Sequence, residues 1–585
     1  MTVSSSLHGI GVSNGIVIAR ALNKKSEALS IPERTIAPDE IPTELSRLDN
    51  AMDKARSQLE KLKCELTEKA ASHSDIIDFQ LMMLDDEELV ENIHTQLRQK
   101  LCCVENAVSL AIDQASKVLL DQDDDYMKER ASDIMDVGRR ILRNLLGMDD
   151  ADTDAEDDPQ RVILVAEDLT PSETAHLDTQ KFAAFITSSG SRTSHTAILA
   201  RALGIPAIVA VQQGIDTISD GDTLALDIAA GTIIINPDDN TVISFLKRDE
   251  RQKMLMAQLV SESRQPTETQ DGYQTSLVAN VELPSEALNV RKKFNVGIGL
   301  FRTEFLFIDK GRYLSEDEQF EAYKSTAQSA YPFSVIFRTL DIGGDKFISQ
   351  VPTPHEVNPF MGTRAIRFSL GKPDLFKTQL RAILRASAYG KVRMMFPMVS
   401  TAEELEMALD YLKEVKEELA SKHISFNDDL DVGCMIEVPS AAILAERLIN
   451  YVDFFSIGTN DLVQYSLAVD RANPSIAYLY QPAHPAVLRQ IKHVVDTAFA
   501  NGKWVSVCGE MASETLYTPL LLGMGIHELS MSPMALASVH KLIRNIKMYE
   551  AEELVAKALA CKNGAEVENL CREYLKRACK ELINA

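Results

Sequence analysis

The chain has 585 residues, of which 45% are hydrophobic and 25% charged, and its 61 basic and 86 acidic residues leave a formal net charge of −25. This composition is typical of a globular protein, and at roughly 150 residues per domain the length predicts about two to four domains. The negative charge argues against a nucleic-acid partner or an anionic membrane surface, because both would be repelled.

Neither a membrane span nor a signal peptide is expected. No apolar run approaches the roughly 18 to 20 residues that cross a bilayer, and the first residues lack the basic-then-apolar order of a signal peptide. The eight cysteines show no paired Cys-x-x-Cys spacing, which argues against a zinc site or a disulfide framework. We therefore expect a cytoplasmic protein without membrane insertion.

The first half of the chain predicts two kinds of structure. Residues 10–19 are rich in β-branched residues and punctuated by glycine, which predicts one or two short strands. From Ile41 to Leu146 glycine is almost absent, and apolar residues such as Leu45, Leu48 and Met52 recur every three or four positions. This periodicity predicts a helical hairpin or bundle, which an acidic linker ending at Pro159 closes.

A small α/β domain is predicted after this linker. Apolar strand-like runs alternate there with helical sequence and turns, at residues 162–166, 182–187, 207–211, 223–228 and 232–236. The N-terminal strands are expected to join the same sheet, which makes the helical bundle an insertion. A charged stretch without Gly or Pro, Phe245 to Ser263, predicts a connecting helix that Pro266 ends.

Eight strand-like segments alternate with helical sequence from Gln274 onward. They are residues 276–281, 296–300, 335–341, 392–398, 432–438, 452–458, 504–509 and 528–532. Repeated βα units over about 300 residues predict a closed (β/α)₈ barrel, whose chemistry lies at the carboxyl ends of its strands.

One histidine lies at a predicted helix start. Thr193, Ser194 and His195 run directly into an amphipathic helical sequence, so Thr193 or Ser194 can cap the helix. The free N–H groups of a helix N-terminus stabilise an anion, which suits a phosphorylated histidine. An imidazole with a pKa near 6.5 is a neutral nucleophile at cellular pH.

Arginines gather at the predicted strand ends of the barrel. Arg302, Arg338 and Arg364 stand there with carboxylates, and Arg471 follows a later strand. Guanidinium groups pair bidentately with phosphate and carboxylate oxygens, so several convergent arginines indicate a small, highly anionic ligand.

Two carboxylates and a cysteine also follow apolar strands. Glu437 and Asp461, with substrate oxygens and waters, can form a magnesium site, although carboxylates at strand ends also serve as helix caps. Cys508 is the cysteine that falls at a strand end on the catalytic side, which favours a role in proton transfer.

Together these motifs resemble enzyme I, the phosphoenolpyruvate-protein phosphotransferase family of the bacterial sugar phosphotransferase system. The resemblance covers nearly the whole chain. Five segments stand in the family order, namely Thr-Ser-His, Arg-Thr-Glu-Phe-Leu-Phe, Arg-Thr-Leu-Asp-Ile-Gly-Gly-Asp-Lys, Phe-Phe-Ser-Ile-Gly-Thr-Asn-Asp-Leu and Cys-Gly-Glu.

The resemblance implies a multidomain α/β fold with a swivelling phosphohistidine domain and a C-terminal TIM-type barrel. Residues 1–30 and 148–240 would form the phosphohistidine domain, and 31–147 an inserted helical subdomain that binds the phosphocarrier protein. Residues 241–266 would form a linker helix. Residues 267–585 would form the phosphoenolpyruvate-binding barrel, through which members of the family dimerise.

The resemblance also implies a reaction. Phosphoenolpyruvate would bind with Mg²⁺ on Glu437 and Asp461, and His195 would take its phosphoryl group and pass it to a histidine of the phosphocarrier protein. Cys508 would protonate the enolate to give pyruvate. Six residues would hold the substrate, namely Arg302, Arg338, Lys346, Arg364, Asn460 and Arg471.

Two positions depart from the family pattern, and two other functions stay open. Ser191 replaces the second glycine before Arg-Thr-Ser-His, and Thr363 stands where some members carry a large aromatic residue. The first alternative is a regulatory or scaffold paralogue with weak turnover. Only Ser191 supports it, and the intact His195, Glu437, Asp461 and Cys508 argue against it. The second is an enzyme like pyruvate phosphate dikinase that lacks its nucleotide domain.

Overall fold

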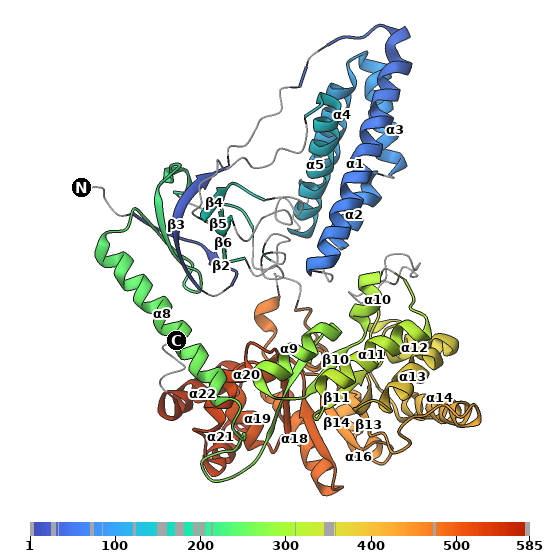
Figure 1. Ribbon diagram of the computed structural model, residues 1–585, viewed down its shortest axis with the longest axis vertical. Coiled ribbons are helices and arrows are strands. Elements are labelled where there is room, and N and C mark those ends of the chain that lie inside the picture. Colours follow the sequence, from blue (N-terminus) through green and yellow to red (C-terminus); the bar gives the residue numbers. More distant parts are fainter. Residues whose placement is uncertain are drawn as a thin grey trace. The chain divides into compact units, whose positions relative to one another are not determined.

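The computed structural model describes most of the chain, as two compact units formed by residues 1–251 and 252–585. Figure 1 shows the helices and strands of each unit. In the described part of the chain, no helix is both long and apolar enough to cross a membrane. The described residues are 5–13, 15–24, 31–32, 34–70, 75–84, 86–120, 125–148, 161–169, 181–190, 197, 200, 205–211, 214–310, 312–343, 356, 358–471 and 476–579.

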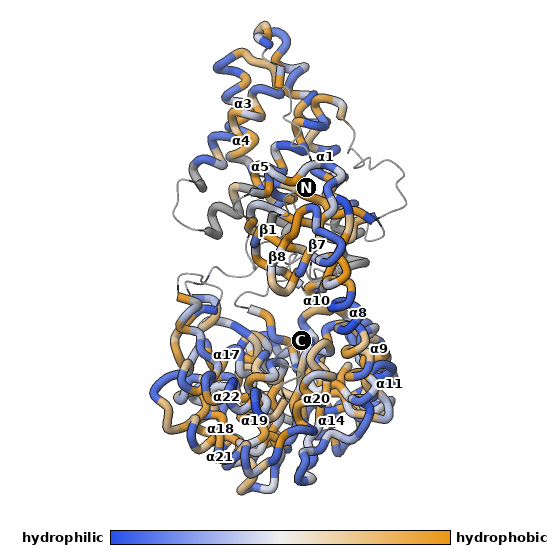
Figure 2. Tube along the Cα trace, turned by 90° about the vertical axis from the view of Figure 1, so that its left-hand side faces the viewer, coloured by the Kyte–Doolittle hydropathy of each residue, from blue (hydrophilic) through white to orange (hydrophobic). Residues whose placement is uncertain are grey.

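The predicted helical region forms helices that pack on one another. Leu48, Ala55 and Leu59 are fully buried, so the three- and four-residue spacing marks the packed face of the first helix. Figure 2 shows that hydrophobic and hydrophilic residues are mixed along α3 and α4. The helices are α1 (Ile41–Ala70), α2 (Asp75–Leu84), α3 (Glu87–Lys100), α4 (Val104–Leu120) and α5 (Asp125–Leu146).

The first unit also contains a mixed sheet in which the N-terminal strands join the later ones, as predicted. Its order is β1-β8-β7-β3-β4-β5-β6-β2, and neighbours from β3 to β6 run parallel. The strands are β1 (Ser5–His8), β2 (Ile10–Gly11), β3 (Ile16–Asn23), β4 (Val162–Ala166), β5 (Phe182–Thr187), β6 (Ala207–Val209), β7 (Thr223–Asp227) and β8 (Thr232–Ile235).

Both faces of this sheet are buried. Ile163 and Val165 of β4 belong to one hydrophobic cluster, whereas Leu164 and Ala166 belong to another. Successive side chains of a strand point to opposite faces, so the two clusters cover the two sides of the sheet. This explains why β4 and β5 are continuous apolar runs rather than alternating ones.

The connecting helix is α8 (Asp239–Glu262). It starts six residues before the predicted Phe245, and two residues before the bound of 241 that the resemblance implies. The reason is that the Asp238 carboxylate accepts a hydrogen bond from the backbone N–H of Thr241 at 2.8 Å, which caps the helix. It ends at Glu262, four residues before Pro266. In its first half Arg248 pairs with Asp227, and in its second half Leu259 packs in the core of the second unit.

The second unit contains a closed parallel barrel in its described residues, as the eight predicted strands require. Leu300 and Ile336 pack inside the barrel, whereas their neighbours Phe301 and Phe337 pack outward against the helices. The strands are β9 (Ser276–Val281), β10 (Ile298–Arg302), β11 (Ser334–Arg338), β12 (Lys391–Phe396), β13 (Val432–Ile436), β14 (Phe454–Ile457), β15 (Trp504–Val507) and β16 (Glu528–Met531).

Helices follow these strands and form the outer layer, which Figure 1 shows around the barrel. They are α9 (Pro284–Phe294), α10 (Glu304–Lys310), α11 (Glu316–Ala330), α12 (Ile366–Gly371), α13 (Pro373–Ser387), α14 (Ala402–Ser421), α15 (Pro439–Ile443), α16 (Ala445–Leu448), α17 (Thr459–Leu467), α18 (Pro485–Ala500), α19 (Thr518–Gly523), α20 (Leu536–Ile543), α21 (Met548–Leu559) and α22 (Gly564–Ala578).

One strand is displaced from its predicted position. The apolar run predicts a strand over 296–300, whereas β10 begins and ends two residues later. The reason is pairing with the next strand, because Arg302 is the register partner of Arg338 and the register shifts between Ile298 and Phe301. Arg302 therefore ends the strand itself and lies at the rim of the barrel.

Candidate active site

The carboxyl ends of the barrel strands carry the polar side chains of the candidate site. Arg302 ends β10 and Arg338 ends β11, Glu437 directly follows β13, and Cys508 directly follows β15. Parallel strands of a barrel end at one rim, so this placement brings residues together that lie far apart in the sequence.

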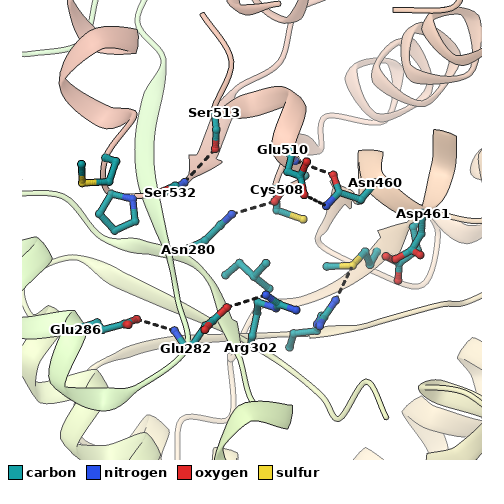
Figure 3. Close-up of a pocket in the computed structure, with 18 of the residues that line it drawn as sticks. Asn280, Glu282, Glu286, Arg302, Asn460, Asp461, Cys508, Glu510, Ser513 and Ser532 are labelled. Carbon is teal, nitrogen blue, oxygen red and sulfur yellow. Dashed lines mark hydrogen bonds and ion pairs between the residues drawn. The ribbon is translucent and has the colours of Figure 1, made fainter. Parts of the chain in front are cut away.

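Eight of the predicted site residues line one cavity of about 620 Å³. Figure 3 shows several of them around it. His195 and Lys346 lie outside the described residues, as does Ser191. The eight are Arg302, Arg338, Arg364, Glu437, Asn460, Asp461, Arg471 and Cys508.

Glu304 holds two of the arginines. Its carboxylate is fully buried, and Oε1 accepts hydrogen bonds from Arg302 Nε at 3.3 Å and from Arg338 Nη2. Arg302 also pairs with Glu282 at 2.8 Å, as Figure 3 shows. Burial lowers the pKa of Arg338, but Glu304 and Asp341 outweigh it and raise that pKa above its ordinary value. The guanidinium is therefore a fixed positive charge.

Arg364 joins two acidic residues from different parts of the barrel. Its Nε donates to Asp341 at 3.0 Å, and its two terminal nitrogens each donate to Asp461 at 3.1 Å. Burial lowers the pKa of Arg364, and the charges of Asp341 and Asp461 raise it overall. The next residue, Ala365, has a φ of 53°, which a non-glycine residue rarely adopts. Such strained backbone is typical of functional sites.

Asn460 and Arg471 are held by one acidic residue, Glu510. The Glu510 carboxylate accepts hydrogen bonds from Asn460 Nδ2 and from Arg471 Nη1, both at 3.2 Å. The backbone N–H of Glu510 donates to Asn460 Oδ1 at 2.8 Å, and Figure 3 shows the two side chains facing each other. Two predicted substrate-binding residues therefore share a carboxylate that lies on an exposed part of the rim.

Glu437 is the buried acid of the site, with 2% of its surface exposed. Its Oε1 accepts a hydrogen bond from the backbone N–H of Met398 at 2.6 Å. Burial raises the pKa of Glu437 well above its ordinary value, and the nearby charges of Asp461 and Asp341 raise it further. A Cβ at Gly458 would lie 2.6 Å from Glu437 Oε2, so the glycine leaves the room that this carboxylate occupies.

The donor set fits a divalent cation at Glu437 and Asp461. Carboxylate oxygens are the ligands that Mg²⁺ prefers, and the charges of Asp461 and Asp341 add to the effect of burial in raising the pKa of Glu437. These two acids are a pair, and the described residues contain no larger cluster of His, Cys, Asp and Glu suited to a metal. In the interactions described above, four arginines face the six carboxylates of Glu282, Glu304, Asp341, Glu437, Asp461 and Glu510.

Cys508 lies where strand β15 meets the cavity, with 6% of its surface exposed. Burial raises the pKa of its thiol to about 11, so the sulfur carries its proton at neutral pH. Ser456 Oγ donates a hydrogen bond to the sulfur at 3.3 Å. Asn280 Nδ2 donates to the Cys508 carbonyl at 3.0 Å, an interaction that Figure 3 shows across the cavity. A buried, protonated thiol is a proton donor rather than a nucleophile.

The site also contains polar residues for which the sequence analysis predicted no function. Asn280 lies on β9 and Glu282 just after it, and both face the cavity. Glu304 lies two residues after Arg302 in the Arg-Thr-Glu segment, and this closeness in the sequence is the one local indication of the contact between the two side chains. Glu510 follows Cys508 in the Cys-Gly-Glu segment, but its contacts with Asn460 and Arg471 cross between strands and depend on the fold.

Three family profiles match the chain and together cover most of it. Residues 8–130 match the N-terminal domain of PEP-utilising enzymes, residues 158–231 match their mobile domain, and residues 256–548 match their PEP-binding domain. The last match contains every described residue of the candidate site.

The chain is also similar to curated proteins over nearly its whole length. A phosphoenolpyruvate-protein phosphotransferase of Bacillus subtilis (strain 168) is 40% identical over 574 residues, which are 97% of this chain and 100% of the relative. A protein of the same name from Haemophilus influenzae is 41% identical over 573 residues, 97% of this chain and 99% of the relative. The chain therefore belongs to the phosphoenolpyruvate-protein phosphotransferase family, a family of enzymes.

Proposed function

We propose that the chain takes a phosphoryl group from phosphoenolpyruvate onto His195, releases pyruvate, and passes the group to a histidine of a small phosphocarrier protein. This is the first step of a sugar phosphotransferase system. The observation that carries the proposal is the convergence of four arginines, two carboxylates, an amide and a thiol on one cavity at the strand ends of the barrel. Phosphoenolpyruvate is small and highly anionic, which such a site suits.

The arginines bind and orient the substrate. Arg302 and Arg338 line the cavity and are anchored by acids, with N–H groups left for the substrate. Arg364 already uses its donors on Asp341, Asp461 and Tyr465, so it must give up some of these contacts to bind substrate. Anchored donors need little reorganisation when charge moves from the bridging oxygen to the enolate. Asn460 and Arg471 release Glu510 and turn to the phosphate, with Lys346 as a further ligand by family resemblance.

Members of this family use a divalent metal, and we propose Mg²⁺ for this chain. Glu437 and Asp461 would hold it, and the bound ion supplies positive charge that offsets the phosphate and the developing enolate. The charge balance supports this assignment, because six carboxylates already outnumber four arginines before an anionic substrate enters. Arg364 contacts Asp461 directly, so it can adjust to an ion at that carboxylate.

Cys508 completes the half-reaction by proton transfer. Its thiol holds a proton at neutral pH and lies against the cavity, so it can protonate the enolate carbon and leave pyruvate. Without this step the phosphoryl transfer is readily reversed, because the enolate is the better phosphoryl acceptor.

The remaining assignments concern domains and partners. We assign residues 1–30 and 148–240 to the phosphohistidine domain, 31–147 to the subdomain that binds the phosphocarrier protein, and 241–266 to the linker helix. Residues 267–585 form the substrate-binding barrel, which also makes a homodimer. We place the protein in the cytoplasm, where its substrate and the carrier meet.

The direct test is phosphoryl uptake. Purified protein with Mg²⁺ and phosphoenolpyruvate should gain one phosphoryl group by intact mass under alkaline conditions, with stoichiometric pyruvate, and peptide mapping should place it on His195. His195→Ala should take up none while still binding phosphoenolpyruvate. Binding without uptake by the natural chain would instead support the scaffold function, with Ser191 as the position to restore to glycine.

A further inference from the structure

Two buried serine hydroxyls inside the barrel lead to the sulfur of Cys508. Ser506 Oγ donates a hydrogen bond to Ser456 Oγ at 2.9 Å, and Ser456 Oγ donates to Cys508 Sγ at 3.3 Å. Ser456 and Ser506 are register partners on β14 and β15, and neither exposes any surface. Both hydrogen bonds therefore point the same way, from the barrel interior toward the thiol.

Hydroxyls are unusual residues for this place. The interior of such a barrel is normally filled by bulky apolar side chains, as Leu300, Ile336 and Met435 fill it here. A buried hydroxyl without a partner costs free energy, so each serine is tolerated because of the hydrogen bond that it makes. Alanine would fill the position of Ser506 without that requirement, yet a donor stands there.

The next polar residue beside Ser506 in the barrel is Glu528, which is not hydrogen-bonded to it. Glu528 is the first residue of β16 and lies opposite Ser506 in the register of β15 and β16, one strand spacing of about 4.8 Å away. It exposes 7% of its surface, and its Oε1 has no hydrogen-bond partner. Burial raises the pKa of Glu528 to about 7, so this carboxyl group can hold or release a proton near neutral pH.

Glu528 is placed at the end of the barrel away from the cavity. It lies at the amino end of its strand, opposite the rim that carries the cavity. The charged group that acts on it is Arg393 of β12, whose side chain is 29% exposed and pairs with the half-exposed Asp431 at 3.0 Å. In the proposal below, water at the amino ends of the strands, which we call the floor of the barrel, supplies protons to Glu528.

We propose that Ser506 and Ser456 form a proton relay that returns a proton to Cys508 from Glu528 and the floor of the barrel. This inference rests on the proposed function, in which Cys508 protonates the enolate. In that step the S–H bond breaks, a C–H bond forms with an electron pair of the enolate, and the sulfur is left as a thiolate.

Return of the proton follows the two hydrogen bonds as far as Ser506. The Ser456 hydroxyl gives its proton to the thiolate and Ser506 gives its own to the Ser456 oxygen. The Glu528 carboxylic acid, which makes no hydrogen bond to Ser506 in this structure, rotates to give one to the Ser506 oxygen. The Glu528 carboxylate then takes a proton from water at the floor. The relay serves the closed site, because the exposed surface of Cys508 faces the cavity that the substrate fills. Ser456, Ser506 and Glu528 are thus positioning residues, and none needs to touch substrate.

Isotope exchange between phosphoenolpyruvate and pyruvate tests the relay on the full chain without a carrier protein. The protein is incubated in D₂O with Mg²⁺, phosphoenolpyruvate and ¹³C-labelled pyruvate, and two rates are followed by NMR. The first is transfer of ¹³C into phosphoenolpyruvate, which counts passages through the site. The second is entry of deuterium into the pyruvate methyl group, which counts how often Cys508 exchanges its hydrogen with solvent between passages.

In the natural chain deuterium should enter at nearly every passage. In Ser506→Ala the ¹³C exchange should change little, whereas deuterium per passage should fall by about tenfold or more because Cys508 returns the same hydrogen that it took. Ser506→Thr keeps a hydroxyl and should restore deuterium entry. Ser387→Ala removes a buried hydroxyl from the outer helix α13 and is the matched control.

The outcomes separate the relay from the proposed function. If Ser506→Ala lowers both rates together, or leaves deuterium per passage unchanged, the serine is only structural and the relay is wrong. If the natural chain shows no ¹³C exchange, the proposed function fails and the relay with it. Glu528→Gln is a second variant, at the other end of the relay. It should also lower deuterium per passage, and it provides the test if Ser506→Ala does not fold.

Discussion

Arg364 binds Asp461 through both terminal guanidinium nitrogens, each at 3.1 Å, so a residue expected to bind substrate occupies a carboxylate expected to bind metal. The same guanidinium also holds Asp341 at 3.0 Å. Arg364 thus supplies positive charge to both acids from within the chain. If Asp461 holds Mg²⁺ and Arg364 holds phosphoenolpyruvate, as we propose, the two ligands bind in a linked way, because both draw on the contacts of Arg364.

Replacement of Arg364 should have opposite effects on the binding of the cation and on the use of phosphoenolpyruvate. In Arg364→Met the acids lose their internal cation, so Mn²⁺ should bind the substrate-free protein more tightly than it binds the natural chain. Loss of the charged donor should lower kcat/KM for phosphoenolpyruvate by about 100-fold. Titration calorimetry with Mn²⁺ and a pyruvate assay measure the two effects.

A neighbouring arginine provides the control for that experiment. Arg367 is 41% exposed and pairs with Glu404 outside the cavity, so Arg367→Met should leave both quantities near their natural values. Arg364→Lys keeps the positive charge, and it serves as a second variant if Arg364→Met does not fold. Weaker Mn²⁺ binding in Arg364→Met would show that Arg364 assembles the cation site rather than competing for it.

Glu304 should act on substrate affinity through the two arginines that it holds. Glu304→Gln keeps the shape of the side chain but removes the charge that anchors Arg302 and Arg338, so both guanidinium groups lose orientation. We expect KM for phosphoenolpyruvate to rise by about tenfold with a smaller change in kcat, because the effect corresponds to the loss of one charged hydrogen bond. The exposed Glu321→Gln on α11 is the control. A fall in kcat at unchanged KM would place Glu304 in the chemical step instead.

Cys508 should be slow to alkylate and essential for pyruvate release. Because burial raises the pKa of its thiol to about 11, the reactive thiolate is scarce at pH 7 and becomes more abundant as pH rises toward that value. Iodoacetamide labelling followed by peptide mapping should show a Cys508 rate that still increases above pH 9, where an ordinary thiol has levelled off. Fast labelling at pH 7 would indicate a thiolate and remove the basis for Cys508 as an acid.

The alanine variant tests the chemistry directly. Cys508→Ala should lower the steady rate of pyruvate formation by about 100-fold or more, the usual contribution of a positioned proton donor. The partly buried Cys561 near the surface is a matched position, and Cys561→Ala should change the rate little.

The architecture was accessible from the sequence because its local patterns agree with the packing. The strands of the barrel are short apolar runs after helical segments. Seven of the predicted ranges contain the whole observed strand or all of it except its first residue. The eighth, β10, is displaced because its register is set by pairing with β11, and pairing between strands leaves no mark in a single run of residues.

The ion pairs of the site were not accessible in the same way. The sequence placed Arg364 and Asp461 at strand ends, but 97 positions separate them, and their contact depends on how the barrel closes. Glu510 stands beside Cys508 in the sequence, yet it contacts Asn460 and Arg471 because β14 and β15 are neighbours. Residue type and strand end predict which groups reach the rim, whereas the closed barrel decides which of them meet.

Glu528 should make the stability of the barrel depend on pH. Its pKa is about 7 in the folded chain against an ordinary value of 4.5, because burial disfavours the carboxylate. Below pH 4.5 the group is protonated in both states and has no effect. Between pH 4.5 and 7 the unfolded chain releases the proton and the folded chain keeps it, so the free energy of unfolding falls as pH rises. Above pH 7 both states are ionised and the loss is complete, at most about 3 kcal/mol.

Glu528→Gln removes this ionisation and should therefore stabilise the barrel at pH 8 but not at pH 4.5. Trp504 is the only tryptophan of the chain and stacks on Phe454 inside the barrel at 4.4 Å, so its fluorescence follows unfolding of this unit in urea. The exposed Glu553→Gln should shift the urea midpoint equally little at both pH values. If Glu528→Gln gives the same shift at pH 4.5 and pH 8, folding leaves the pKa of Glu528 near its ordinary value, and the carboxyl group cannot be the proton reservoir of the relay near neutral pH.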